Sequence, residues 1–259
     1  MDFPSRDPAA TKGISGKVLV IGGSPSMHGA PILAALGALA ADVDLVRLAL
    51  PAKHAEVARN AHLNLIVEEF SREHFSHGDA EELASKAGEW ADAVVIGCGF
   101  GEAEFTAVET FLQRYTGKAV LDAGALYRPV VDIVAGRADT LLTPHSGEFL
   151  RMTEMKPTTE NVAKMAKHYR FSILKKGAVD IITGPAEVHE NTTGCPQMAV
   201  GGTGDALAGI CGGLMARGME PFAAACLAAE KWGQTGEAMA QEQRVLSAQA
   251  LLQRFAATG

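Results

Sequence analysis

Short, almost uninterrupted apolar runs alternate along this chain with longer segments whose apolar residues recur at helical spacing. The first run, KVLVIGG at 17–23, ends in two glycines and is followed at once by a helical pattern. Runs that are apolar at nearly every position are typical of strands covered by helices on both faces, and such strands form mostly parallel sheets. The same pattern predicts further strands at 44–50, 63–69, 92–99, 118–124, 139–144, 172–177 and 180–185, with a short edge strand at 188–191.

Helical patterns fill most of the stretches between these strands. The first, at 30–41, tolerates Pro31 because proline is accepted in the first turn of a helix. Apolar residues from Leu207 to Leu214 fall on one face of a later helix, which Gly218 would end. Further helices are predicted at 52–60, 79–90, 102–116, 147–153, 159–169, 221–241 and 247–257.

The alternation contains no low-complexity linker and no repeat, which predicts a single domain at 16–259 behind a polar N-terminal segment at 1–15. A chain of 259 residues with 47% hydrophobic residues can bury one large core. The net charge of −7 argues against a nucleic-acid-binding surface. The four cysteines form no C-x-x-C pair, the N-terminus lacks the apolar core of a signal peptide, and no run approaches the roughly 20 apolar residues of a membrane span. We therefore expect a soluble cytoplasmic protein that binds neither nucleic acid nor membrane.

The segment AVGGTGDALAGI at 199–210 places four small residues, Gly201 to Gly204, directly before Asp205 and a predicted helix. Glycines let backbone N–H groups turn inward, and the positive end of the helix dipole adds to them, so this loop can bind phosphate oxygens. Asp205 can then accept a proton from a substrate hydroxyl at the same place. The alternative is that Asp205 only caps the helix, which aspartate does well. The density of glycines favours the functional interpretation.

Other predicted strand ends also carry glycine-rich or polar motifs, and ligands of open α/β sheets bind at the carboxyl edge. GCGFG at 97–101 lacks the G-x-G-x-x-G spacing and there is no Walker A motif, so 201–205 is the candidate phosphate loop. TPHSGE places His145 and Glu148 at a helix start, where both residues also have a structural explanation. KKG at 175–177 offers a phosphate-pairing lysine or a solvated strand end. The strand ends with such motifs are 22–31, 97–101, 121–124, 143–148 and 175–180.

Six segments together carry a family resemblance: GGSPSMHGAPILAALGAL, VVIGCGFG, AVLDAGAL, LLTPHSGEFLRM, LKKGAVDII and NTTGCPQMAVGGTGDALAGI. In this order, from about residue 16 to 240, they resemble the ADP/ATP-dependent NAD(P)H-hydrate dehydratases of the ribokinase-like superfamily. T-P-H-x-G-E combined with G-G-T-G-D is specific to this family, whereas G-x-G-D alone marks only the superfamily. The resemblance implies a single-domain, three-layer α/β/α sandwich with a mostly parallel central sheet. We expect no room for the epimerase domain that some members carry as an N-terminal fusion.

This family restores NADH or NADPH from forms that are hydrated at the nicotinamide ring, with ADP or ATP driving the loss of water. The resemblance implies that Asp205 deprotonates the hydroxyl of the hydrate, which then attacks the terminal phosphoryl group of the nucleotide. It also implies Mg²⁺ between the phosphates, through Glu148 and water, and a homo-oligomer, a tetramer in many members. The implied contacts to the hydrated dinucleotide are Ala30, Gly99, His145 and Asp205. Those to the nucleotide are Lys176, Gly177, Ala178, Val179, Asp180, Gly201, Gly202, Thr203 and Gly204.

The chain departs from the family pattern in the loops around these motifs. A proline is usual where Cys98 stands and an aspartate where Gly124 stands, and an aromatic residue is common near 27–28. In the segment before G-G-T-G-D, a typical asparagine, glycine and threonine are replaced by Cys195, Gln197 and Val200.

Two other functions stay open. One is a kinase of the same superfamily that acts on a vitamin-precursor alcohol, against which the T-P-H-x-G-E motif argues. The other is a nucleotide-binding protein that has lost catalysis, against which the intact Asp205 argues.

Overall fold

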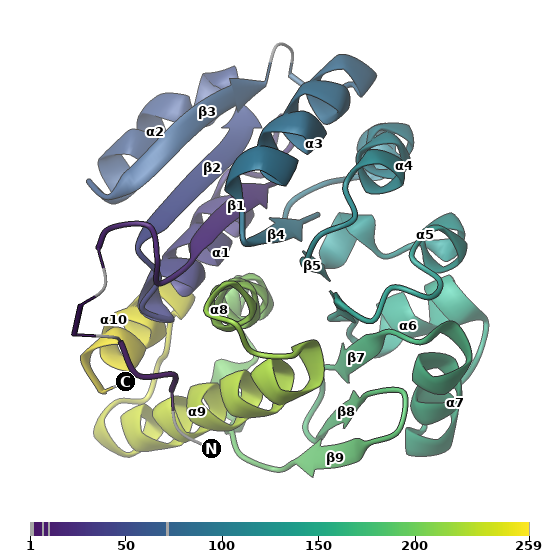
Figure 1. The fold of residues 1–259 in the computed structure, drawn as a ribbon. Coiled ribbons are helices and arrows are strands. Elements are labelled where there is room, and N and C mark those ends of the chain that lie inside the picture. The colour runs from purple at the N-terminus through teal and green to yellow at the C-terminus, as the bar shows by residue number, and fades with distance from the viewer. Residues whose placement is uncertain (1–2, 7, 10, 71–72, 259) are drawn as a thin grey trace.

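Nine strands form one central sheet through the part of the chain that the structure describes, in the order β3-β2-β1-β4-β5-β6-β7-β8-β9 (Figure 1). Strands β1 to β7 pair in parallel, and β8 and β9 add antiparallel pairs at one edge. This confirms the mostly parallel sheet that the apolar runs predict. The strands are β1 Lys17–Ile21, β2 Leu45–Pro51, β3 Leu65–Phe70, β4 Ala93–Ile96, β5 Ala119–Leu121, β6 Thr140–Leu142, β7 Ser172–Lys175, β8 Asp180–Thr183 and β9 Val188–Asn191.

The computed structural model of the chain describes residues 3–6, 8–9, 11–70 and 73–258. Residues 1, 2, 7 and 10 of the predicted N-terminal segment, and 71, 72 and 259 of the predicted domain, lie outside the described residues. No helix within the described ranges is long and apolar enough to cross a membrane.

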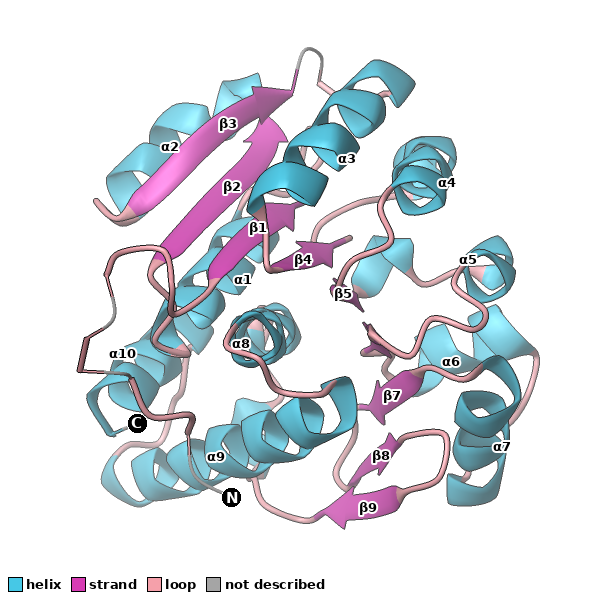
Figure 2. Cartoon of the chain, in the orientation of Figure 1, coloured by secondary structure: helices cyan, strands magenta, loops and turns pink. Residues whose placement is uncertain are grey.

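Helices cover both faces of the sheet and make the molecule a three-layer α/β/α sandwich (Figure 2). Helices α1, α2, α8, α9 and α10 enclose one core, and α3 to α7 enclose the other. In β1, Val18 and Val20 belong to the first core and Leu19 and Ile21 to the second. Because both faces of the strand are buried, nearly every position must be apolar. The helices are α1 Gly29–Ala40, α2 Ala55–Ala61, α3 His77–Trp90, α4 Phe105–Arg114, α5 Arg128–Ile133, α6 Ser146–Thr153, α7 Thr159–Tyr169, α8 Thr203–Ala216, α9 Pro221–Glu242 and α10 Ala248–Thr258.

The predicted elements differ from the observed ones in their ends and in the short helices, and several strands are shorter than predicted: β4, β5 and β6 end before the glycines and polar residues that the predictions at 92–99, 118–124 and 139–144 included. Helix α5 is missing from the prediction because its six residues are too few to show a helical period. The helix predicted at 102–116 begins as a 3-10 turn, Glu102–Glu104, before α4. Helix α3 begins two residues earlier than predicted, after Ser76, whose side chain accepts the Asp79 N–H in a capping box.

Helix α8 is the element that brings the candidate site together. It packs against α1 and over β1, β4 and β5 in the middle of the sheet. A Cβ on Gly209 would lie only 1.9 Å from the carbonyl oxygen of Ala34 in α1, so a glycine is needed for this close approach. The first turn of α8 consequently lies at the carboxyl edge of the sheet, beside the loops that follow β4, β5, β6 and β7.

Candidate active site

The loop before helix α8 places Asp205 in the first turn of that helix. Gly202 is the N-cap residue, with a φ of 92°, in the left-handed region that glycine adopts without strain. The Thr203 hydroxyl lies 3.0 Å from the carbonyl oxygen of Met198 and 2.9 Å from that of Val200, which holds the loop against the helix. Gly202 is the N-cap residue and Asp205 is the third helical residue, so Asp205 does not occupy the N-cap position.

The Asp205 carboxylate faces side chains from two other loops. One oxygen of Asp205, one oxygen of Asp122 and Cys98 Sγ all lie within 4.8 Å of one another. Asp205 is partly exposed, whereas the other two are buried. Burial raises the pKa of Asp205 to about 6, the Asp122 carboxylate adds to the rise, and Lys176 and Cys98 oppose it. A carboxylate with this pKa is well matched to accepting a proton near neutral pH.

Lys176 pairs with Asp122 at the end of β7. The distance from Lys176 Nζ to Asp122 Oδ1 is 2.6 Å, and the Lys176 side chain is 17% exposed. The Thr143 hydroxyl lies 2.8 Å from the same oxygen. Burial alone would lower the pKa of Lys176, but the Asp122 and Glu148 carboxylates and Cys98 together outweigh it, and the pKa is raised. Lys175 is also buried, so the interpretation of this lysine pair as a solvated strand end is wrong.

The segment 176–180 forms a closed turn between β7 and β8. The Gly177 N–H donates to Asp180 Oδ1 over 2.9 Å, and the Asn191 side-chain amide donates to Asp180 Oδ2 over 3.0 Å. Burial raises the pKa of Asp180, although both donors oppose that rise. The Asp180 carboxylate therefore holds the turn closed. The Lys176 side chain pairs instead with Asp122, which lies beside Asp205.

His145 and Glu148 cap helix α6 reciprocally. His145 Nδ1 accepts the N–H groups of Gly147 over 3.0 Å and of Glu148 over 3.2 Å, and Glu148 Oε2 accepts the His145 N–H over 2.8 Å. Nε2 of the same imidazole lies 3.3 Å from Glu148 Oε1. These bonds satisfy N–H groups that have no partner within the helix. The imidazole is still 58% exposed and lines a pocket, so His145 combines a structural role with access to a ligand.

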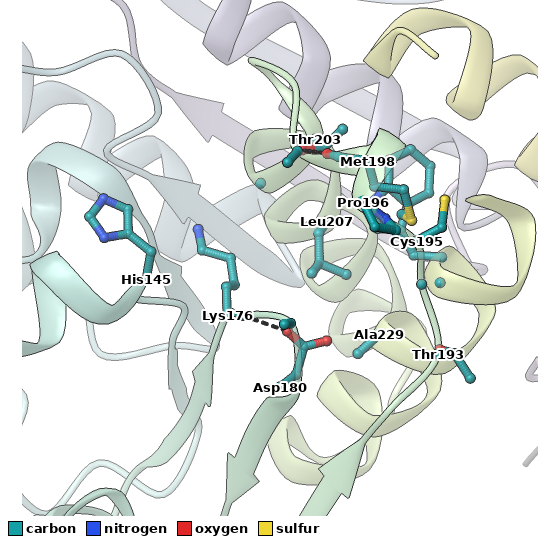
Figure 3. Close-up of a pocket in the computed structure, with 17 residues that line it drawn as sticks. His145, Lys176, Asp180, Thr193, Cys195, Pro196, Met198, Thr203, Leu207 and Ala229 are labelled. Carbon is teal, nitrogen blue, oxygen red and sulfur yellow. Dashed lines mark hydrogen bonds between the residues drawn. The ribbon is translucent and has the colours of Figure 1, made fainter. Parts of the chain in front are cut away.

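A pocket of about 600 Å³ opens beside the first turn of α8, a volume typical of small-molecule sites. In Figure 3 the side chains of His145, Lys176 and Asp180 lie on one side of it, opposite the segment 193–198. The predicted residues that line it are His145, Lys176, Gly177, Ala178, Asp180, Thr203 and Gly204. Among the described residues, the lining does not include the other predicted ones, which are Ala30, Gly99, Glu148, Val179, Gly201, Gly202 and Asp205. No residue of the other wall was predicted as a site residue, although part of it lies in the family motif at 191–210. This wall consists of Thr193, Gly194, Cys195, Pro196, Met198, Ala199, Leu207, Ala229, Trp232 and Gly233.

The two other predicted substrate contacts, Ala30 and Gly99, lie together near Asp205. A Cβ on Gly99 would lie 3.3 Å from the Cβ of Ala30 and equally far from that of Met27. The Gly23 N–H donates to the Cys98 carbonyl over 2.8 Å and so ties the loop after β1 to the loop after β4. Since the Cys98 side chain also contacts Asp205, the base adjoins both groups of predicted residues.

Asp122 is the site residue that sequence reasoning missed. It follows β5 directly, in the polar strand end at 121–124, and that position was the only signal in the sequence that could have identified it. Its partner Lys176 follows β7, two strands away in the sheet. The pairing therefore becomes visible only when the order of the strands is known.

The structure shows what surrounds three of the positions at which this chain departs from the family pattern. Cys98 lies in the cluster with both aspartates. At Gly124, the carbonyl oxygen of Phe100 lies 2.5 Å from where a Cβ would be, so an aspartate would not fit without a shift. Near the position where an aromatic residue is common, the rings of His28 and His54 contact each other with centroids 5.2 Å apart.

Relatives of this chain are known both by sequence and by structure. A family model described as NAD(P)H-hydrate dehydratase matches residues 18–256. The ADP-dependent (S)-NAD(P)H-hydrate dehydratase of Cenarchaeum symbiosum is 38% identical over 248 residues, which cover 92% of this chain and 86% of that protein. The bifunctional NAD(P)H-hydrate repair enzyme Nnr of Methanothermobacter thermautotrophicus is also 38% identical, over 91% of this chain but 48% of its own length.

Among solved structures, the ADP/ATP-dependent NAD(P)H-hydrate dehydratase from Bacillus subtilis, co-crystallised with ATP and Mg²⁺, superposes with a TM-score of 0.83. Its sequence is 26% identical, and the superposition covers 97% of this chain and 91% of that one. A hydroxyethylthiazole kinase from Pyrococcus horikoshii, 17% identical with a TM-score of 0.64, shares the fold. On the match of the family model and the identity to these relatives, the chain belongs to the NAD(P)H-hydrate dehydratase family.

Proposed function

We propose that this protein converts hydrated NADH or NADPH back to NAD(P)H, with ADP or ATP as co-substrate. The observation that supports this most directly is the partly exposed Asp205 carboxylate beside Asp122, whose partner Lys176 lines a pocket of about 600 Å³. Membership of the family supports the type of reaction, and the names of the relatives support the hydrate and the nucleotide as substrates.

The proposed reaction has two steps. Asp205 takes the proton of the hydrate's hydroxyl, whose oxygen forms a bond to the terminal phosphorus of the nucleotide while the bond from that phosphorus to the nucleotide's leaving oxygen breaks. AMP leaves if the nucleotide is ADP, and ADP leaves if it is ATP. The lone pair of the ring nitrogen then expels inorganic phosphate, and the adjacent ring carbon loses a proton to restore the double bond. Phosphate is a much better leaving group than hydroxide, which is why the nucleotide drives the dehydration.

The nucleotide is proposed to bind with its phosphates against residues 201–204 and its adenosine near 176–180. Backbone N–H groups at a helix N-terminus attract phosphate oxygens, and the Lys176 ammonium can stabilise charge that develops on the transferred group. The wall that includes Pro196 and Trp232 offers an apolar surface for the adenine ring. A complex with the adenosine phosphates seated at 22–24 instead would contradict this placement.

When bound, Mg²⁺ would neutralise charge between the phosphate groups of the nucleotide. Glu148 fits this ion through water, because a carboxylate is a hard oxygen donor. The hydrogen bond from the His145 N–H to Oε2 holds this carboxylate in a fixed orientation. The group formed by Cys98, Asp122 and Asp205 fits it less well, since a thiol stands between the two carboxylates and Asp122 is paired with Lys176.

The decisive experiment measures the return of reduced-nicotinamide absorbance from hydrated NADPH, and separately from hydrated NADH, with ADP or ATP and Mg²⁺. Recovery that requires the nucleotide and is lost in Asp205→Asn is the expected result. Nucleotide binding without any recovery would indicate a protein that has lost catalysis. Phosphorylation of a thiazole or pyrimidine alcohol without dehydration would indicate a kinase.

We also propose a cytoplasmic location and assembly into a homo-oligomer, a tetramer by family resemblance. Cys98, Cys195, Cys211 and Cys226 are free thiols, which supports a reducing compartment. Light scattering after size-exclusion chromatography would measure the number of subunits.

A further inference from the structure

Cys98, Asp122, Lys176 and Asp205 form one connected cluster, although each comes from a different loop or helix. Lys176 Nζ lies 2.6 Å from Asp122 Oδ1, and the Cys98 thiol donates to Asp122 Oδ2 over 3.6 Å. Cys98 Sγ also lies within 4.8 Å of an oxygen of the Asp205 carboxylate. The contacts therefore connect Lys176 to Asp205 through two buried side chains, Asp122 and Cys98. Neither of them has a role in the reaction as proposed above.

Asp122 cannot itself serve as the base. It is 2% exposed, and both of its oxygens already have a partner. Two ionised carboxylates as close as Asp122 and Asp205 repel each other, so ionising both costs free energy unless a cation nearby compensates for the repulsion. Lys176 supplies that cation, and its Nζ lies 3.2 Å from the point where a Cβ on Gly204 would be. Asp122 thus holds an ammonium group against the first turn of α8, where the transferred phosphoryl group is proposed to pass.

The Cys98 thiol stays protonated in this position. Burial raises its pKa well above the ordinary value, and the two carboxylates add to the rise. The thiol carries one hydrogen, which it donates to Asp122 Oδ2 in this structure. Rotation about the Cβ–Sγ bond would direct the same hydrogen to Asp205 instead.

We propose that Asp122 and Cys98 are positioning residues for the phosphoryl transfer: Asp122 holds the Lys176 ammonium at the first turn of α8, and the Cys98 thiol orients the Asp205 carboxylate. This proposal rests on the proposed function. The titratable groups that face Asp205 are Cys98 from the loop after β4, Asp122 from the loop after β5 and Lys176 from the end of β7. Helix α1, which packs against α8, carries no titratable residue.

The first variant is Asp122→Asn, which keeps the size of the side chain and removes its charge. Loss of the negative charge beside Asp205, together with an ammonium that is no longer neutralised, shifts the acid limb of the kcat profile to lower pH by about one unit. Because Lys176 loses its partner, kcat is expected to fall about tenfold or more. The KM for the nucleotide is expected to change less than kcat.

The second test compares Cys98→Ala with Cys98→Ser. Alanine removes the donor that stabilises the charged form of Asp205, so the acid limb of the profile shifts to higher pH. Serine keeps a donor and is expected to leave the limb close to its wild-type position. Opposite shifts in Asp122→Asn and Cys98→Ala are a signature that a general loss of packing would not produce.

The titration of Asp205 can also be read without activity, from its ¹³C carboxyl resonance, assigned by comparison with Asp205→Asn. Absence of turnover in the wild-type protein would count against the proposed function, whereas an Asp205 titration unchanged in a folded Asp122→Asn variant would overturn the positioning role.

The control is Asp44→Asn, far from the site, which should lower the melting temperature and leave the titration unchanged. If Asp122→Asn does not fold, the two Cys98 variants decide, and identical titrations in both would overturn the proposal.

Discussion

At the scale of single residues, Asp205 owes its chemistry to its surroundings, since burial beside Asp122 raises its pKa to about 6. We expect Asp205→Asn to lower kcat by roughly 10²–10⁴-fold, the usual range for the loss of a general base. In the wild-type protein, kcat should fall as the pH drops below about 6, because the base becomes protonated. Hydrate turnover measured across pH, with nucleotide titrations to verify binding, checks both expectations.

The same substitution has a predictable effect on stability. A folded-state pKa that is raised above the unfolded value means that ionisation of Asp205 costs stability as the pH rises through about 6. Asparagine has no charge to bury and does not replace a cap, because Gly202 occupies that position. Asp205→Asn should therefore melt at or above the wild-type temperature at about pH 8, and the difference should vanish below about pH 4. A clearly lower melting temperature at about pH 8 would contradict this account.

His145 calls for two substitutions, because it both caps α6 and lines the pocket. His145→Ala removes the acceptor for two backbone N–H groups and should cost about 1 kcal/mol of the free energy of unfolding. His145→Asn retains an acceptor at the cap but removes the imidazole. If His145 orients the hydrated dinucleotide, the asparagine variant keeps its stability and loses affinity for the hydrate more than for ADP or ATP. Separate titrations of the two ligands measure this, and unchanged hydrate affinity in a stable variant would remove His145 from the substrate contacts.

Motifs identified the site residues that lie within one stretch of sequence with a recognisable pattern. Asp205 follows a glycine-rich loop, and His145 and Glu148 share one helix start within the T-P-H-x-G-E motif, so local motifs and the family resemblance they carry selected these residues as candidates. Asp122 has no such motif around it, and its importance depends on Lys176, which is 54 residues away in the chain. Contacts of that kind are made by tertiary structure and leave no local signature.

At the scale of elements, the position of α8 depends on its close packing against α1. Gly209→Ala would place a Cβ 1.9 Å from the Ala34 carbonyl oxygen, so we expect a loss of about 1–3 kcal/mol in the free energy of unfolding. Because α8 carries Asp205, turnover should fall as well. The matched control is Gly88→Ala in α3, where nothing lies within 4 Å of the new Cβ and a gain of about 0.5–1 kcal/mol is expected. Denaturant unfolding of both variants tests the pair, and equal effects would show that the helix contact does not require glycine.

Elements were predictable where burial imposes a pattern on every residue. Strands such as β4, buried on both faces, leave a continuous apolar run in the sequence. Helix α5 and the 3-10 turn at 102–104 are too short to show a period, and their form depends on the chain that packs over them.

At the scale of the whole molecule, Asp44 ties the polar N-terminal segment to the domain. Its Oδ2 accepts the N–H groups of Gly13 over 2.7 Å and Ser15 over 2.9 Å, and its Oδ1 accepts from Arg6 over 2.7 Å. The Ser15 N–H, helped by Gly13 and Arg6 and opposed by burial, lowers the pKa of Asp44. The stabilisation that this pKa reflects is present above about pH 4 and is lost as the pH falls through the folded-state pKa.

Asp44→Asn is expected to lower the melting temperature by roughly 3–10 °C near neutral pH and by less in acid. Turnover should not change, because Asp44 precedes β2 at the amino edge of the sheet and the site lies at the carboxyl edge. Thermal melts across pH, with hydrate turnover at one pH, measure both effects. A fall in turnover without a fall in stability would place Asp44 in communication with the site.

By itself the sequence determined the parallel class of the sheet and selected Asp205, Lys176 and His145 as candidate site residues, because two-sided burial and short motifs are written in neighbouring positions. Only the tertiary structure decided that Asp122 and Cys98 lie beside the base. Their meeting depends on the strand order, which places the ends of β4 and β5 next to each other under the first turn of α8. Strand order results from the packing of the whole chain, so no local pattern of hydrophobic and polar residues encodes it.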